Sequence, residues 1–377
     1  MSVRREQHEG GRPAVAFILV AVAVAAFAGC ASQPSGALAC KRVALEPQPR
    51  WTFFGHWTDG GEELVIADVL AGRLLRYNRD GSHAGSVVRP GGGSLEFDRP
   101  IELAGAGSEL ILVNRTDHIL GLSNGLEAKW GVHLQKLELE GGERLTFLRS
   151  VVPVGEQQLV GLLRLEGETT PWWGFGRVVL GSSPRVERIL RLPSERTPAG
   201  DLYAMTMPLV ARVGGAVYAL RFEDEPHVQR LLPSPHRLGA FPSGEVAPVL
   251  PPNLGPNSTE GRYRAIENAT MPTTLVGRGQ FLYLLTRKPR VEGGTTWKLH
   301  QIDPEKDKLH RSMTLPTHAS HLVVVPGPVD WAFIEKGPVG PGAEQHIGSM
   351  VLIPSTWIED PTAGVLLTGD CLAGDAS

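Results

Sequence analysis

Residues 63–81, ELVIADVLAGRLLRYNRDG, contain two short apolar runs and a turn. The first run is Glu63–Asp68, the second is Arg73–Tyr77, and Asp80-Gly81 is a dipeptide that favours a tight turn. The same arrangement returns 46 positions later, in residues 109–125. A strand-rich repeat of about 40–50 residues is typical of β-propeller blades.

Four weaker copies of this pair of strands follow along the chain. They lie in residues 158–180, 216–231, 281–302 and 331–353. The spacing lengthens between the second and third of these copies, where Pro233 to Gly261 forms an insertion rich in proline and glycine. Long insertions of this kind are either functional or disordered. Six units predict an all-β fold, a six-bladed β-propeller, and the alternative is a seven-bladed propeller in which the insertion hides one blade.

Residues 62–137 resemble the first two blades of an NHL-type or TolB-like six-bladed propeller. The shared pattern is an apolar strand, Asp or Asn, a short loop, a second strand and Asp-Gly. It continues to Phe97-Asp98-Arg99-Pro100, which is similar to the phrase that precedes each new blade in that family. These motifs are degenerate, so the resemblance implies a fold and not a function.

The amino terminus has the features of a bacterial lipoprotein signal peptide. Three arginines in the first 12 residues precede an apolar run from Ala14 to Ala28. That run suits a signal-peptide core of about 7–15 residues better than a membrane span of about 20. Phe27-Ala28-Gly29-Cys30 resembles the lipobox, although Phe27 stands where leucine is usual. The resemblance implies cleavage before Cys30 and a lipid on its thiol, and the alternative is a plain signal peptide or a short anchor.

The expected organisation is a signal peptide at 1–29, a lipidated cysteine and tether at 30–50, and a propeller domain at 51–374 that carries the insertion at 233–261. The small and polar residues after the cysteine are typical of a tether. We therefore expect an exported chain, anchored by lipid to the cell membrane or the outer membrane, with its domain in the periplasm or outside the cell. If the cell is Gram-negative, the lipoprotein resemblance implies the outer membrane, because Ala31 is not an aspartate.

The chain has three cysteines, and lipidation of Cys30 would leave Cys40 and Cys371 near the two ends of the domain. An oxidising compartment permits a disulfide between them. Closing so long a loop would stabilise the fold by at most about 5 kcal/mol. A bridge requires the two ends of the domain to meet, as they do in a closed ring, and two free thiols are the alternative.

Composition limits the class of protein. Hydrophobic residues make up 42% of the 377 residues, which is enough for a large core. The 45 glycines and 30 prolines are spread along the chain and favour short strands and turns over long helices. The formal net charge of −3 does not indicate a nucleic-acid partner, since such partners require a basic surface.

The sequence contains no convincing catalytic motif. Gly121-Leu122-Ser123-Asn124-Gly125 matches the G-x-S-x-G pattern of serine hydrolases, but it lies between two predicted strands without the helix that this motif requires. Six-bladed lactonases of the gluconolactonase type hold a divalent cation with Glu, Asn and Asp. Asp68 and Asn114 could supply two such ligands, but we find no matching glutamate. We therefore expect no catalytic residue, metal or cofactor, and a metal-dependent lactonase or lyase is the alternative.

Polar residues follow the first apolar run of each repeat. They are Asp68, Asn114, Arg115, Arg164, Arg221, Arg287 and Lys336. The corresponding strand ends of a propeller lie on one face around its axis, so the five cations could hold an anionic ligand or an acidic partner segment. The offsets differ by one residue between repeats, and solvated arginines at strand ends are the alternative.

Trp172 and Trp173 follow Thr170-Pro171 in the loop expected between two strands of the third repeat. Adjacent aromatic rings on a loop can form a platform for a sugar or a partner protein. In the alternative, one ring lies in the core and the other shields it.

Together these features favour a membrane-tethered lipoprotein whose propeller is a binding or scaffold module. Its expected partners are the membrane, through lipid on Cys30, and an envelope protein or a ligand. The alternatives are the metal-dependent enzyme and a sensor of small anions.

Overall fold

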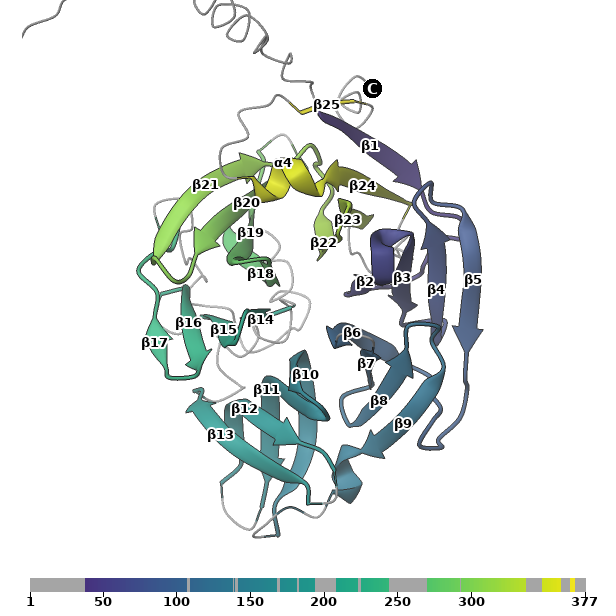
Figure 1. Cartoon of the computed structure of the whole chain (residues 1–377), viewed down its shortest axis with the longest axis vertical. Helices are drawn as coiled ribbons and strands as arrows, with labels where there is room; N and C mark the ends of the chain where they lie inside the picture. The colour runs from purple at the N-terminus through teal and green to yellow at the C-terminus, as the bar shows by residue number, and fades with distance from the viewer. Residues whose placement is uncertain are drawn as a thin grey trace, which may run out of the picture.

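Six sheets surround a central axis as the blades of a propeller (Figure 1). The computed structural model describes residues 38–106, 109–137, 139, 142–167, 170–181, 183–193, 208–222, 225–243, 270–291, 293–336, 348–360 and 367–369. The predicted six-bladed β-propeller is therefore confirmed. Cys30, Cys371 and residues 244–261 of the expected insertion lie outside the described residues.

Five blades are four-stranded sheets formed by consecutive stretches of chain. Blade 1 contains β2 (Gly55–Trp57), β3 (Glu63–Asp68), β4 (Arg73–Asn78) and β5 (His83–Val88). Blade 2 contains β6 (Pro100–Ala106), β7 (Glu109–Asn114), β8 (His118–Ser123) and β9 (Ala128–His133). Blade 3 contains β10 (Arg144–Gly155), β11 (Gln158–Glu166), β12 (Trp172–Val179) and β13 (Arg185–Arg191). Blade 4 contains β14 (Val210–Val213), β15 (Ala216–Arg221), β16 (His227–Leu232) and β17 (His236–Arg237). Blade 5 contains β18 (Met271–Arg278), β19 (Phe281–Pro289), β20 (Thr295–Asp303) and β21 (Lys308–Thr314).

Blade 6 is built from both ends of the described chain. It contains β22 (His321–Val325), β23 (Asp330–Lys336), β24 (Ser349–Pro354), β1 (Leu38–Ala44) and β25 (Leu367–Gly369). β1 pairs antiparallel with β24, and β25 then pairs parallel with β1. The N-terminal strand thus completes the last blade and closes the ring. Residues 38–44, which the sequence analysis assigns to the tether, are part of the propeller because their main chain extends this sheet.

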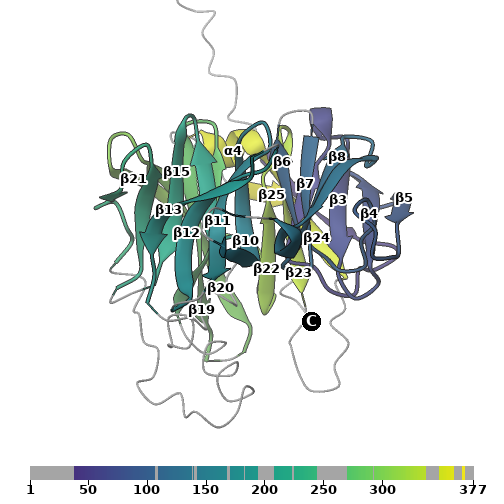
Figure 2. The same ribbon diagram turned by 90° about the horizontal axis from the view of Figure 1, so that it is seen from below.

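The ring has two faces. On the hairpin face, the innermost strand of each blade turns into the second strand; on the crossover face, the chain passes from one blade to the next. Pro354 at the end of β24 pairs with Asp330 at the start of β23, so the helix α4 (Ser355–Glu359) and the start of β1 lie on the hairpin face. Figure 2 shows the ring edge-on, with α4 at its upper edge.

Helix is scarce in the described part of the chain. Besides α4 it contains the short 3-10 helices η1 (Asp59–Gly61) and η2 (Leu134–Lys136). Among the described residues, no helix has the length and apolar character needed to cross a membrane.

The hydrophobic core lies between neighbouring blades. Residues 64–68 of β3 and 110–114 of β7 are consecutively buried, whereas every residue of the outermost strands β5 and β13 is at least partly exposed. The middle strands pack against a neighbouring blade on each face, so both sets of alternating side chains are buried. This explains why the repeats are visible in the sequence as unbroken apolar runs.

Candidate functional site

A cavity of about 740 Å³ lies on the propeller axis. Most of its lining residues come from the innermost strands or the residues next to them, and all six blades contribute; Glu109 on β7 and Lys129 on β9 are added from blade 2. The apolar lining consists of Phe54, Leu103, Ala104, Val151, Val152, Pro153, Pro208, Val210, Ala211, Leu275, Val276, Val324 and Pro326. The charged or titratable lining consists of His56, Glu102, Glu109, Lys129, Glu156, Arg212 and Arg278.

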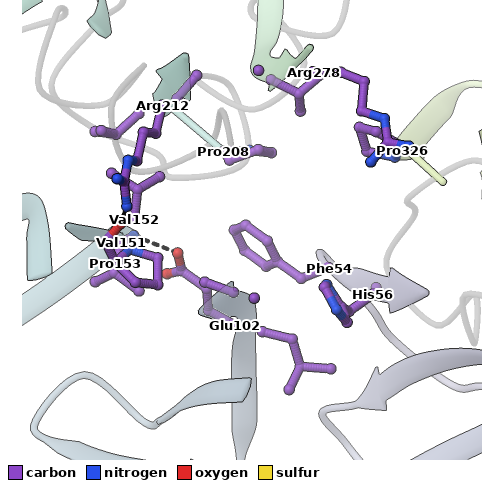
Figure 3. A pocket seen from close by; sticks show the side chains of 18 of the residues that line it. Phe54, His56, Glu102, Val151, Val152, Pro153, Pro208, Arg212, Arg278 and Pro326 are labelled. Carbon is purple, nitrogen blue, oxygen red and sulfur yellow. Dashed lines mark hydrogen bonds between the residues drawn. The ribbon is translucent and has the colours of Figure 1, made fainter. Parts of the chain in front are cut away.

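Glu102 on β6 is the one acidic side chain of this lining that is fully buried, with 1% of its surface exposed. Its carboxylate accepts hydrogen bonds from the main-chain N–H groups of Ser150, at 2.7 Å, and Val151, at 2.5 Å. Burial raises the pKa of Glu102 to about 7, and the two N–H donors and Arg149 oppose that rise. Figure 3 shows this carboxylate bonded to the neighbouring blade, beside the ring of Phe54, which extends into the cavity.

The hydrogen bonds of Glu102 belong to a chain of contacts that joins four blades. Ser150 interrupts the register of β10 and has a positive φ of 50°. Its hydroxyl accepts a hydrogen bond from the N–H of Leu209, at 3.1 Å, and Pro208 accepts one from Leu275, at 2.9 Å. Blades 2 to 5 are therefore connected next to the axis through polar groups that would otherwise be buried without partners.

Glycines let the innermost strands approach one another around the cavity. A Cβ atom on Gly277 of β18 would lie 2.1 Å from the main-chain oxygen of Arg212 on β14. A Cβ atom on Gly105 of β6 would lie 2.4 Å from the imidazole of His56. Both distances are far below a normal contact. A larger residue at position 277 would displace the main chain of β14, whereas one at position 105 would displace the imidazole of His56.

Two arginines lie on the wall opposite Glu102 and Phe54 (Figure 3). Arg212 is exposed and donates hydrogen bonds to the main-chain oxygens of Pro153 and Gly214. Arg278 forms an ion pair with Glu359 of α4, at 3.2 Å. The cavity thus combines an apolar interior with a mixed set of charged groups.

A second group of residues lies on the crossover face. It consists of three basic side chains and an aromatic ring, and we name it the Lys336 cluster: Lys336, Arg287, His321 and Phe53. Lys336 at the end of β23 is 5% exposed, and its Nζ lies 4.6 Å from the centre of the Phe53 ring. It pairs in register with His321 at the start of β22. Burial lowers the pKa of Lys336 to about 7.

The electrostatics of the Lys336 cluster are dominated by positive charge. Burial lowers the pKa of His321 to about 3, and the cations of Lys336 and Arg287 lower it further. Arg287 on β19 is 5% exposed. The structure thus brings together two members of the cationic ring that the sequence predicts, and it adds a histidine from a third strand.

Asp68 and Asn114 hold equivalent positions in blades 1 and 2. Asp68 accepts hydrogen bonds from the N–H groups of Arg50 and Ala71 and from the guanidinium of Arg73. Asn114 accepts hydrogen bonds from the two N–H groups of residues 98–99. Both side chains are buried and connect a strand end to the segment that enters the blade. These contacts explain why a polar residue ends this strand in both repeats, and no bound ligand is needed for that explanation.

Of the other predicted cations, Arg115 forms an ion pair with Asp98, and Arg164 forms one with Glu166 at 3.2 Å. Arg221 ends β15 and is half-buried. Binding of a ligand by these residues stays a prediction.

Trp172 and Trp173 lie at the start of β12 and not on a loop. Trp172 is 7% exposed and packs in the core between blades 2 and 3, while Trp173 is 9% exposed and packs in the core that includes blade 4. The two rings occupy opposite cores because adjacent residues of a strand point to opposite faces of the sheet. The predicted position on a loop is therefore wrong, and both rings lie in hydrophobic cores.

Cys40 lies on β1, is 2% exposed and takes part in a disulfide. Its partner lies outside the described residues. The parallel pairing of Cys40 with Gly369 brings the C-terminal segment to β1, so the ends of the propeller meet. The Cys40–Cys371 pairing and lipidation of Cys30 stay predictions.

Within the described ranges, no three side chains of His, Cys, Asp or Glu are grouped so that they could hold a metal ion. The sequence analysis missed Glu102, Phe54 and Arg212 at the cavity and Phe53 in the Lys336 cluster. The signal for Glu102 was a single acid inside the otherwise uncharged stretch PIELAGA, residues 100–106.

The chain was compared with known protein families, curated proteins and solved structures. No protein-family model matches the chain, and no curated protein is similar to it in sequence. A gluconolactonase from Xanthomonas campestris aligns with a TM-score of 0.49 and 11% identity over 84% of this chain and 89% of its own. BamB from Moraxella catarrhalis aligns with a TM-score of 0.34 and 10% identity over 80% of this chain and 82% of its own. YCF48 bound to D1 peptide aligns with a TM-score of 0.39 and 11% identity over 84% of this chain and 97% of its own.

Proposed function

We propose that this chain is an exported, lipid-anchored binding protein whose axial cavity takes an apolar segment of an envelope protein. The observation that carries the proposal is the cavity of about 740 Å³ on the hairpin face. Binding sites are usually concave and mostly apolar, with a few polar groups that orient the ligand. Here the apolar walls would receive side chains, and the charged groups would bond to the polar main chain of the segment.

The position of β1 supports a partner in the same membrane. β1 begins on the hairpin face at Leu38, only eight residues after Cys30. Eight residues span at most roughly 28 Å when fully extended. A lipid on Cys30 would therefore hold the hairpin face, and the cavity with it, close to the bilayer surface.

The test uses the full-length lipidated protein in native envelopes. A photo-reactive residue at Lys129, on the cavity lining, is expected to cross-link one envelope protein. The same residue at Val88, which is 54% exposed on the outermost strand of blade 1, serves as the matched control and should not cross-link it.

Filling the cavity decides whether the contact is specific. Val152→Trp places a large ring on the lining and should abolish the cross-link from Lys129, whereas Val88→Trp should leave it unchanged. Cys30→Ser should weaken it by removing the anchor. Equal cross-linking in the Val152→Trp and Val88→Trp proteins would rule out the cavity as the binding site.

A further inference from the structure

Lys336 lies in an environment that buried amines seldom occupy. It is 5% exposed, and in the described part of the chain its Nζ contacts the face of Phe53 but forms no hydrogen bond or ion pair. Buried ammonium groups are normally paired with a carboxylate, because transfer of an isolated charge out of water is very unfavourable. A cation–π contact offsets only part of this cost.

The groups around Lys336 are one cation and two uncharged rings. His321 pairs with it in register from β22 and is uncharged above pH 4, because its pKa is about 3. Arg287 on β19 lies close enough to His321 to lower that pKa, and Phe53 lies in the segment before β2. The neighbouring carboxylate of Glu335 is bonded elsewhere, to Arg42 at 3.1 Å and to the hydroxyl groups of Thr317 and Ser349. Successive side chains of a strand point to opposite faces, so Glu335 does not neutralise Lys336.

We propose that Lys336, Arg287 and His321 form a binding site for a small oxyanion, namely the carboxylate or phosphate group of a ligand, on the crossover face. An oxyanion at this place would accept charge-assisted hydrogen bonds from the ammonium of Lys336 and the guanidinium of Arg287. The guanidinium of Arg287 suits a planar, two-oxygen contact, and Lys336 supplies a compact charge. The site is independent of the lipid anchor and of the axial cavity, which lies toward the opposite face.

The site has a built-in dependence on pH. Because burial lowers the pKa of Lys336 to about 7, the amine carries its charge below pH 7 and loses it above. The oxyanion is therefore bound more tightly at pH 6 than at pH 9. A bound anion would also raise the pKa of His321 from about 3, because it offsets the neighbouring cations.

The experiment titrates the full-length chain with sulfate and with acetate, by calorimetry at pH 6 and pH 9. Both anions keep a constant charge over this range, so a change in affinity reports on the protein. We expect saturable binding of at least one anion at pH 6, weakened tenfold or more at pH 9. Tighter sulfate would indicate a phosphate ligand, and tighter acetate would indicate a carboxylate ligand.

Three variants make the result specific. Lys336→Met should weaken binding at pH 6 at least tenfold, as expected for loss of one charge-assisted hydrogen bond. Lys336→Arg keeps its charge at pH 9 and should bind equally at both values, a result that a structural role of Lys336 would not produce. Arg185→Ala, which removes an exposed cation on the outermost strand β13, should bind as the parent protein does. Absence of saturable binding at pH 6, or unchanged binding in the Lys336→Met protein, would overturn the proposal.

Discussion

Glu102 at the axial cavity and Lys336 on the crossover face are both buried and titratable, but their surroundings differ. Glu102 accepts two main-chain hydrogen bonds, and its pKa is raised to about 7 because burial exceeds the effect of these donors. Lys336 contacts an aromatic face, and its pKa is lowered to about 7 by burial alone. The buried carboxylate thus joins two blades through its donors, whereas the buried amine has no counter-charge among the described residues.

The largest expected effect is on the pH dependence of stability through Lys336. Its pKa is about 7 in the fold and near 10.4 in the unfolded chain, so the unfolded state binds more protons between these values. The free energy of unfolding should therefore rise from pH 7 to pH 10 relative to the Lys336→Met protein, by up to about 4 kcal/mol. Urea unfolding of both proteins, in a buffer of low anion content, measures this difference. If the free energies of unfolding of the two proteins change in parallel with pH, Lys336 is paired with a counter-charge in the fold.

Loss of the carboxylate of Glu102 is expected to be the next largest effect. Glu102→Ala leaves the N–H groups of Ser150 and Val151 buried without acceptors, which should cost about 3 kcal/mol. Urea unfolding at pH 7 measures this loss. Glu102→Gln keeps one acceptor oxygen and should lose less than half as much. If Glu102→Ala lowers the free energy of unfolding by less than about 0.5 kcal/mol, the contact does not stabilise the packing of blades 2 and 3.

The pH dependence of Glu102 has the opposite sign to that of Lys336. Because its pKa is raised in the fold, the folded state binds more protons between pH 4.5 and pH 7. Its contribution is fully present below pH 4.5 and is lost as the pH rises through 7. Between pH 5 and pH 7, stability should therefore fall by about 2 kcal/mol relative to the Glu102→Gln protein. The same urea series, extended to pH 5, tests the sign.

The smallest expected effect concerns the aromatic contact of Lys336. Phe53→Leu keeps an apolar contact but removes the ring face that lies 4.6 Å from Nζ. The charged amine should lose about 1 kcal/mol of stabilisation. Phe53 also packs against Trp51 and the hydrophobic core, so part of the loss is independent of pH. The loss should therefore be larger at pH 6, where the amine is charged, than at pH 10. An equal loss at both values would indicate packing alone and not a cation–π contact.

The cavity and the Lys336 cluster were not equally visible in the sequence. Arg287 and Lys336 lie near the ends of buried strands, and this regular position predicted them as two members of a larger ring of polar residues on one face. Glu102 is a lone acid in a short innermost strand, and its partners lie 48 and 49 residues away. Trp172 and Trp173 were assigned to a loop because the sequence does not show that β12 begins at Trp172.

The sequence alone determined the class of fold and predicted six blades, with seven as the alternative. Middle strands are buried on both sides, so each repeat leaves an unbroken apolar run that can be counted. Only the tertiary structure decided that there are six blades, that β1 completes blade 6, that the innermost strands enclose a cavity, and that His321 joins Arg287 and Lys336. These features depend on contacts between blades, and closure of the ring alone brings such distant residues together.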